Sequence, residues 1–166
     1  GWEFNVIPYV ISPISSVLVG WLIEKLIQKG YNLLLIRKCS EAASQYVRVL
    51  LLTLIANLHS YEGVLFCVVL CFGVGPFHTA GVHMNPMDIA PQHAGTVFGF
   101  MNSVGALPGI IGVYTTGYIL ETTNSWKLVF YGTAFLNFIG CSLFLMWGRV
   151  SPIISSPTIN SAGPDL

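Results

Sequence analysis

The sequence predicts an all-α fold, a polytopic bundle of transmembrane helices. Of its 166 residues, 54% are hydrophobic and only 8% are charged, whereas soluble domains carry about a quarter charged residues. The hydrophobic residues gather in long runs, and about 20 apolar residues suffice for a helix to cross the hydrocarbon layer. The chain is therefore expected to be an integral membrane protein with the lipid bilayer as its surroundings.

Polar turns and basic loops divide the chain into five expected spans, at about residues 5–27, 40–58, 63–84, 90–120 and 126–147. Residues 1–148 form the membrane part, and the tail 149–166, rich in Ser, Pro and Asn, is expected to be disordered. The ends of the first, third and fifth spans share one side. That side holds the basic residues Lys25, Lys29, Arg37, Lys38 and Arg149. Because an excess of Lys and Arg marks the cytoplasmic side, the C-terminus is expected to be cytoplasmic.

A glycine-rich stretch without Asp, Glu, Lys or Arg runs from Ile89 to Leu120. Glycines at four-residue spacing let two membrane helices approach closely. We interpret the stretch either as one tightly packed helix or as a helix that slides against a partner during transport. In the second interpretation, Asn102 and Ser103 face a polar cavity. The candidate packing residues are Gly95, Gly99, Gly105 and Gly109.

Glu41 and Arg48 lie seven residues apart in the second span and therefore on nearly the same helix face. We expect both to lie near the cytoplasmic interface, with the Arg48 side chain reaching toward water. The alternative is an intramembrane cation that faces the interior of the bundle.

His78 lies in the third apolar span, with His83 five residues further on. A lone histidine in such a helix is expected to be a hydrogen-bonded packing residue, and proton coupling or anion contact is the alternative. Neither histidine has metal ligands at a suitable spacing, so no metal or cofactor is expected.

The polar segment before the glycine-rich stretch predicts a helix start. Asn85 would cap this helix, Pro86 would occupy its first position and Asp88 would lie at the positive end of its dipole.

Charge and motif content argue against two classes of function. The formal net charge is zero, which gives no electrostatic reason to expect a nucleic acid polymer as a partner. No nucleophile elbow, HExxH motif or paired carboxylates appear, so an enzyme is not expected.

Three motifs resemble one family of membrane carriers. They are NPMDIAP at 85–91, NSVGALPG at 102–109 and GYILETTNSW at 117–126. In this order they resemble the anion transporter family of the major facilitator superfamily, which holds vesicular nucleotide, vesicular glutamate, sialic-acid and sodium-phosphate carriers. The third motif is most similar to the vesicular nucleotide branch. The resemblance covers about residues 1–148 and implies that the five spans are helices 8–12 of a major facilitator fold.

The resemblance also implies a gating loop at the cytoplasmic side. Residues 20–38 are similar to the cytoplasmic G-x-L-A-D-R/K loop motif of the superfamily, with Glu24 in place of the usual Asp. The gating candidates are Gly20, Glu24, Lys25, Arg37 and Asp88, and the substrate-path candidates are His78, Asn102 and Ser103.

The function implied is that of a fragment of a secondary active transporter of small organic anions, with nucleotides such as ATP as candidate substrates. Such carriers alternate access by rocking two halves around a central site, driven by membrane potential or an ion gradient. The expected partner is the missing N-terminal half, in a vesicle, lysosomal or plasma membrane. The alternative is a non-transporting membrane subunit or truncated product that packs against other membrane proteins.

Overall fold

A computed structural model describes residues 2–151, with side chains from residue 6 onward. Within this range the structure is helical and has no strand. The five long helices are α1 (Trp2–Gln28), α2 (Leu33–Asn57), α3 (Tyr61–His78), α5 (Ala94–Thr123) and α6 (Trp126–Trp147). Three short turns connect α3 to α5: the π-helix η1 (Thr79–His83), α4 (Asn85–Ile89) and the 3₁₀-helix η2 (Pro91–His93). The predicted all-α class is confirmed, and the expected tail beyond residue 151 lies outside the described residues.

Four stretches of helix are long and apolar enough to cross a membrane: Val6–Gln28, Tyr61–Ile89, Pro91–Thr123 and Trp126–Trp147. Helix α2 has 25 residues, which is also sufficient length. It is less apolar because it carries the charged residues Arg37, Lys38, Glu41 and Arg48. The chain is a multi-pass membrane protein, and its second helix brings charge into the bundle.

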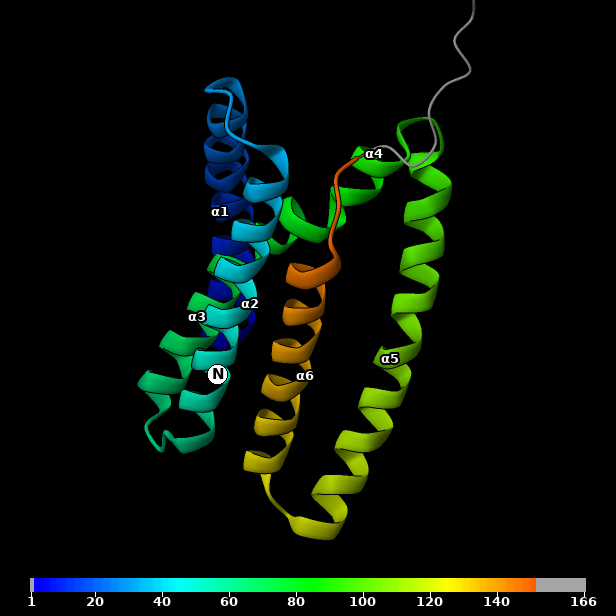
Figure 1. Cartoon of the computed structure of the whole chain (residues 1–166). Coiled ribbons are helices and arrows are strands. Elements are labelled where there is room, and N and C mark those ends of the chain that lie inside the picture. Colours follow the sequence, from blue (N-terminus) through cyan, green and yellow to red (C-terminus); the bar gives the residue numbers. More distant parts are fainter. Residues whose placement is uncertain (1, 152–166) are drawn as a thin grey trace, which may run out of the picture.

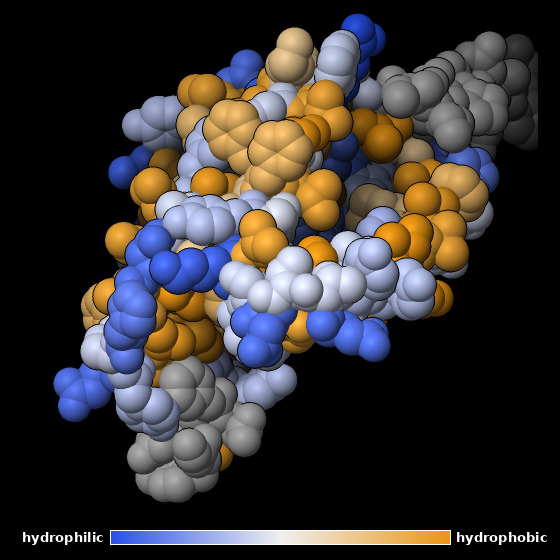
Figure 2. Space-filling view, turned by 90° about the horizontal axis from the view of Figure 1, so that it is seen from below, coloured by the Kyte–Doolittle hydropathy of each residue, from blue (hydrophilic) through white to orange (hydrophobic). Residues whose placement is uncertain are grey.

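The helices run up and down between two ends of the molecule. The turn between α1 and α2, the short helix α4 and the end of α6 lie at one end, and the turns α2–α3 and α5–α6 lie at the other (Figure 1). This is the alternation expected from the sequence. Figure 2 looks onto the second end, where hydrophilic residues gather beside clusters of hydrophobic ones.

Helix α2 occupies the centre of the bundle. It packs most extensively on α6 and α3, while α1 packs on α3. On the α6 side of this contact, the small residues Ala134 and Cys141 are buried, and small residues allow two membrane helices to approach closely. Side chains also bond across this interface, with Asn57 Nδ2 donating to the Tyr131 hydroxyl at 2.8 Å.

Helix α5 contributes little to this core. None of its residues is buried, and its main neighbours are α4, η2 and α6. In Figure 1 it stands apart from α1, α2 and α3. Large apolar side chains along it are open, with Val113 77% and Tyr114 76% exposed. This surface requires lipid or another apolar partner.

Helix α2 begins earlier than the expected residue 40. Asn32 caps it, because its Oδ1 accepts the backbone N–H groups of Leu34 at 2.9 Å and Leu35 at 3.4 Å. Arg37 therefore belongs to the first turns of a helix and not to a loop, and its side chain points in a fixed direction.

Candidate functional site

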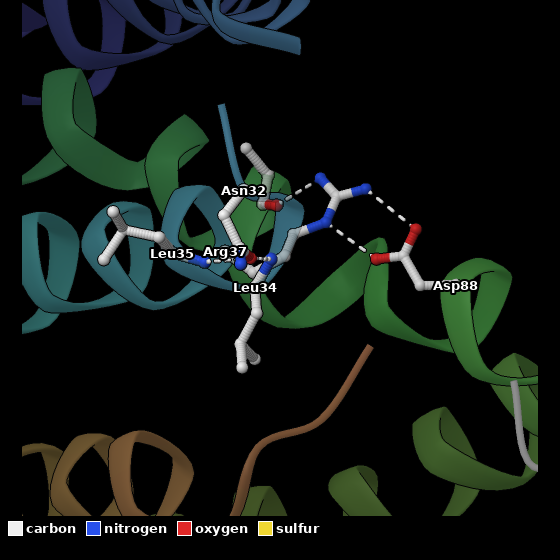
Figure 3. Close-up of polar contacts among 6 residues, drawn as sticks. Asn32, Leu34, Leu35, Arg37 and Asp88 are labelled. Carbon is white, nitrogen blue, oxygen red and sulfur yellow. Dashed lines mark hydrogen bonds and ion pairs between the residues drawn. The ribbon is translucent and has the colours of Figure 1, made fainter. Parts of the chain in front are cut away.

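An ion pair joins α2 to α4 at the end of the molecule that holds the α1–α2 turn. Arg37 Nε donates to Asp88 Oδ2 at 2.8 Å, and Nη2 donates to Oδ1 at 3.1 Å (Figure 3). The remaining Nη1 donates to the Ala80 carbonyl oxygen at 2.7 Å. The two charged side chains are 9% and 12% exposed. This two-pronged geometry is among the stronger ion pairs available to proteins.

The path of the backbone before α4 places Asp88 for this contact. The chain is already helical at Met84, with φ −82° and ψ −15°, and the Met84 N–H bonds back to Thr79 and Val82. Asn85 is thus the first residue of α4 and not its cap, so the predicted cap is wrong. Its Oδ1 is buried without a hydrogen-bond partner among the described residues. Asp88 lies in the first turn as expected, but its partner is a guanidinium.

The other gating candidates lie close to this ion pair along α1. Gly20, Glu24 and Arg37 all line a cavity of about 530 Å³ between α1, α2 and the α3–η1 junction. Glu24 Oε1 accepts from Gln28 Nε2 at 3.2 Å. Lys25 Nζ lies 3.7 Å from the centre of the Trp21 ring, a cation–π contact. The structure therefore brings Gly20, Glu24 and Arg37 to one cavity and places Lys25 beside an aromatic ring.

A second set of polar residues continues along α2 toward its middle. Glu41 is 2% exposed, and its Oε2 lies 2.7 Å from His78 Nδ1. Gln45 Nε2 lies 3.2 Å from the same nitrogen. A separation of 2.7 Å between His78 Nδ1 and Glu41 Oε2 is a short hydrogen bond, in which the ring and the carboxyl group share one proton. His78 is therefore hydrogen-bonded, as the sequence predicted, but to a buried acid.

Arg48 lies one helical turn beyond Gln45. Its Nη1 donates to Gln45 Oε1 at 3.4 Å, and its other terminal nitrogen is 3.6 Å from where a Cβ on Gly75 would be. Helix α2 runs from Leu33 to Asn57, so Arg48 is near its middle and faces α3. This favours the alternative interpretation, an intramembrane cation facing the bundle interior, over the preferred position at the cytoplasmic interface.

The π-helix η1 brings the backbone of the third span close to Glu41. A Cβ on Gly81 would lie 3.0 Å from Glu41 Oε2 and 3.1 Å from the Glu41 backbone nitrogen. Only glycine fits this approach without displacement. Single π-turns inside longer helices are frequent at functional sites, and here the turn lies against a buried carboxylate.

Two further cavities of about 390 Å³ each adjoin η1, and Val82 lines both. The first lies between α2, the α3–η1 junction and α6 and includes Glu41, Gln45, His78, Asn137 and Cys141 in its wall. The second lies between η1 and α5 and is lined by Val82, His83, Met101, Asn102, Gly105 and Ala106. His78 lines the first cavity and His83 the second, and their rings meet edge to face with centroids 5.1 Å apart.

The substrate-path candidates are therefore distributed over different places. His78 lines the first cavity and Asn102 the second. Ser103 is exposed, and its hydroxyl donates to the Gly99 carbonyl of its own helix at 2.9 Å. Sequence reasoning missed Gln45 and gave His83 no role. The spacing of Glu41, Gln45 and Arg48 at i, i+4 and i+7 could have revealed Gln45, because such positions share one face.

The four candidate packing glycines have open surroundings within this chain. A Cβ built on Gly95, Gly99, Gly105 or Gly109 would meet nothing within 4 Å. Close packing at these positions thus requires a neighbour from outside the described residues. In the part of the chain that the structure describes, no group of three or more His, Cys, Asp or Glu residues could hold a metal ion.

Comparison with known proteins adds several related transporters. The chain is 31% identical over 158 residues to the voltage-gated purine nucleotide uniporter SLC17A9 of Mus musculus, covering 95% of this chain and 35% of that protein. It is 33% identical over 159 residues to the protein of the same name from Homo sapiens, covering 95% and 36%. The probable chloroplastic anion transporter 1 of Oryza sativa is 29% identical over 148 residues, covering 89% and 27%. The chain thus spans about a third of the length of these relatives, and no family model matches it.

Proposed function

Because the chain is homologous to the anion transporter family of the major facilitator superfamily, we propose that it forms part of a secondary active carrier of small organic anions. The observation that carries this proposal is the match along 95% of the chain to purine nucleotide uniporters of mouse and human. Nucleotides are accordingly the first substrates to test. The relatives are named as transporters and not as enzymes.

The open face of α5 supports a second helical half as the partner. Gly95, Gly99, Gly105 and Gly109 leave a smooth surface that no side chain of the described chain fills. In carriers of this architecture the substrate site lies near the bilayer midplane, where two helical repeats meet. We propose that α5 forms one wall of this meeting surface and slides along the other half during transport.

The charged end of the molecule is proposed to face the cytoplasm. Four basic residues lie near the α1–α2 turn: Lys25, Lys29, Arg37 and Lys38. The opposite end has one Lys or Arg, Lys127, just after the α5–α6 turn. The positive-inside rule assigns the first end to the cytoplasm. A vesicle membrane is the proposed location, because the motif at residues 117–126 is most similar to the vesicular nucleotide branch of the family.

Membrane potential supplies sufficient free energy for such a carrier. One elementary charge crossing about 100 mV gains about 2.3 kcal/mol. An anion carrying several negative charges would be concentrated accordingly on the positive side of the membrane.

The test is uptake by liposomes that contain the full-length carrier including this chain. Labelled ATP, urate, glutamate and phosphate are supplied in turn under an imposed potential, and protein-free liposomes serve as the control. Potential-dependent uptake of at least one anion is expected. No uptake of any of the four would overturn the carrier proposal and favour a non-transporting membrane subunit.

A further inference from the structure

The Glu41 carboxyl group lies deep inside the helix bundle. The Glu41 side chain is 3% exposed, and its ion-pair partner within the described residues is His78. An ionised carboxylate in a low-dielectric interior is costly unless a partner neutralises it. Membrane proteins keep such residues mainly where they have a function.

The charged groups around the pair are engaged elsewhere. Arg37, one turn before Glu41 on α2, is held by Asp88 of α4 at 2.8 Å. Arg48 bonds Gln45 on the same helix. From the other elements, His83 of η1 touches the His78 ring, and Cys141 of α6 lines the same cavity as Glu41. The charge of Glu41 is thus balanced mainly by His78.

We propose that Glu41 and His78 form a proton-binding site, and that His83 connects this site to the cavity beside α5. The pair is neutral when it holds one proton, either as a carboxylate with an imidazolium or as a carboxylic acid with a neutral ring. Conversion between the two breaks the His78 Nδ1–H bond and forms an O–H bond on Glu41 Oε2, with no other change. Loss or gain of a proton leaves a net charge in the bundle, so exchange requires access to water.

The arrangement of the two histidines provides a route for that exchange. His78 is 28% exposed at its side chain, so one part of the ring is accessible while Nδ1 is bonded to Glu41. The His83 ring lies between His78 and Phe98 of α5, at 5.1 and 5.8 Å between centroids. His83 also lines the α5-side cavity with Asn102. A movement of α5 would therefore change how easily water reaches His83.

A role for this proton in transport rests on the proposed function. If α5 slides during transport, the site gains or loses its proton in one conformation more readily than in the other. This makes the proton a candidate coupling ion for the carrier. The binding of the proton itself depends only on the geometry of Glu41, His78 and His83.

The site is tested by nitrogen NMR of the full chain in lipid nanodiscs, with ¹⁵N-labelled histidine and with His78→Asn to assign the signal. The ¹⁵N signal of His78 Nδ1 is expected to report the hydrogen bond to Glu41 Oε2. In Glu41→Gln this signature should be lost, because the carboxylate that shares the proton is gone. Glu62→Gln, which changes a carboxylate in the exposed first turn of α3, is the matched control and should leave the signal unchanged.

Two further variants keep the proposal testable if Glu41→Gln does not fold. In His78→Gln the infrared carbonyl band of a protonated carboxyl group should appear, because Glu41 loses its partner. In His83→Gln, exchange of the His78 ring proton with solvent should slow severalfold. A His78 Nδ1 signal that Glu41→Gln leaves unchanged would overturn the site.

The coupling role has a separate measurement. Anion uptake by the full-length carrier is followed with and without a pH gradient, in the parent and in Glu41→Gln. A response to the gradient that is lost in the variant is expected, and an equal response in both would overturn coupling through this pair. Absence of uptake in the parent contradicts the proposed function and leaves the NMR result standing.

Discussion

Arg37 and Asp88 are 51 residues apart in the sequence and meet through two bonds, of 2.8 and 3.1 Å, that tie α2 to α4. The contact also fixes η1, because the same guanidinium donates to the Ala80 carbonyl. The Arg37 side chain therefore bonds two of the three short segments between α3 and α5, η1 and α4. Only the short helix η2 separates α4 from α5, so the ion pair anchors the chain close to where the glycine-rich helix begins.

Removing one partner of this pair should destabilise the chain strongly. Asp88→Asn leaves the Arg37 charge largely buried and unpaired, and such losses amount to about 3–5 kcal/mol. Unfolding in mixed detergent micelles, followed by circular dichroism, measures the change. The double variant Arg37→Gln/Asp88→Asn should lose less than Asp88→Asn alone, because no unpaired charge remains. An equal or larger loss in the double variant would contradict this account.

The start of α2 depends on one side chain. Asn32→Ala removes the bonds to the Leu34 and Leu35 N–H groups and should cost about 1 kcal/mol. Ser60 precedes α3 in the same position but makes no side-chain capping bond, so Ser60→Ala is the matched control. The same unfolding measurement applies to both. Equal losses in the two variants would show that the Asn32 cap contributes nothing specific.

The fold class follows from composition for a simple physical reason. Lipid cannot hydrogen-bond a backbone, which leaves helices or closed barrels as spanning structures, and continuous apolar runs of about 20 residues have the length of spanning helices. The boundaries of α2 were harder to predict, because Arg37 and Lys38 look like loop residues. The structure shows how each charge is satisfied within a helix, Arg37 by Asp88 and Lys38 Nζ by the Leu145 carbonyl at 2.7 Å.

The candidate site was predicted only in part. Arg37, Asp88 and His78 were selected as functional residues, but their partners were not, since a single sequence does not reveal which distant residues meet. Glu41 and His78 are 37 residues apart. The Asn85 cap was wrong because a π-helix precedes α4 and the chain arrives there already helical. A π-turn has no strong signature in residue types.

Gly81 should tolerate no side chain. In Gly81→Ala the new methyl group would lie 3.1 Å from the Glu41 backbone nitrogen, and a backbone atom cannot rotate away. Overpacking of this kind costs about 1–3 kcal/mol. The control is Gly132→Ala on α6, where an added Cβ meets nothing within 4 Å and better helix propensity gives up to about 1 kcal/mol of stabilisation. The stability of both variants is measured by unfolding in detergent. If Gly81→Ala leaves the stability unchanged, the close approach of η1 to Glu41 is contradicted.

The glycines of α5 are expected to be needed for transport by the full-length carrier but not for the stability of the isolated chain. Gly105→Leu places a large side chain where the structure has open space, so stability of the isolated chain should change by less than about 0.5 kcal/mol, as for ordinary surface substitutions. In the full-length carrier the same leucine would separate α5 from the proposed second half and lower anion uptake at least severalfold. Gly132→Leu, on an equally open position of α6, is the control and should leave uptake near that of the parent. Uptake that survives Gly105→Leu would mean that α5 does not slide against another helix at this position. Equal losses of uptake in both variants would mean that any bulky residue facing lipid disturbs the carrier, which contradicts a specific role for the α5 glycines.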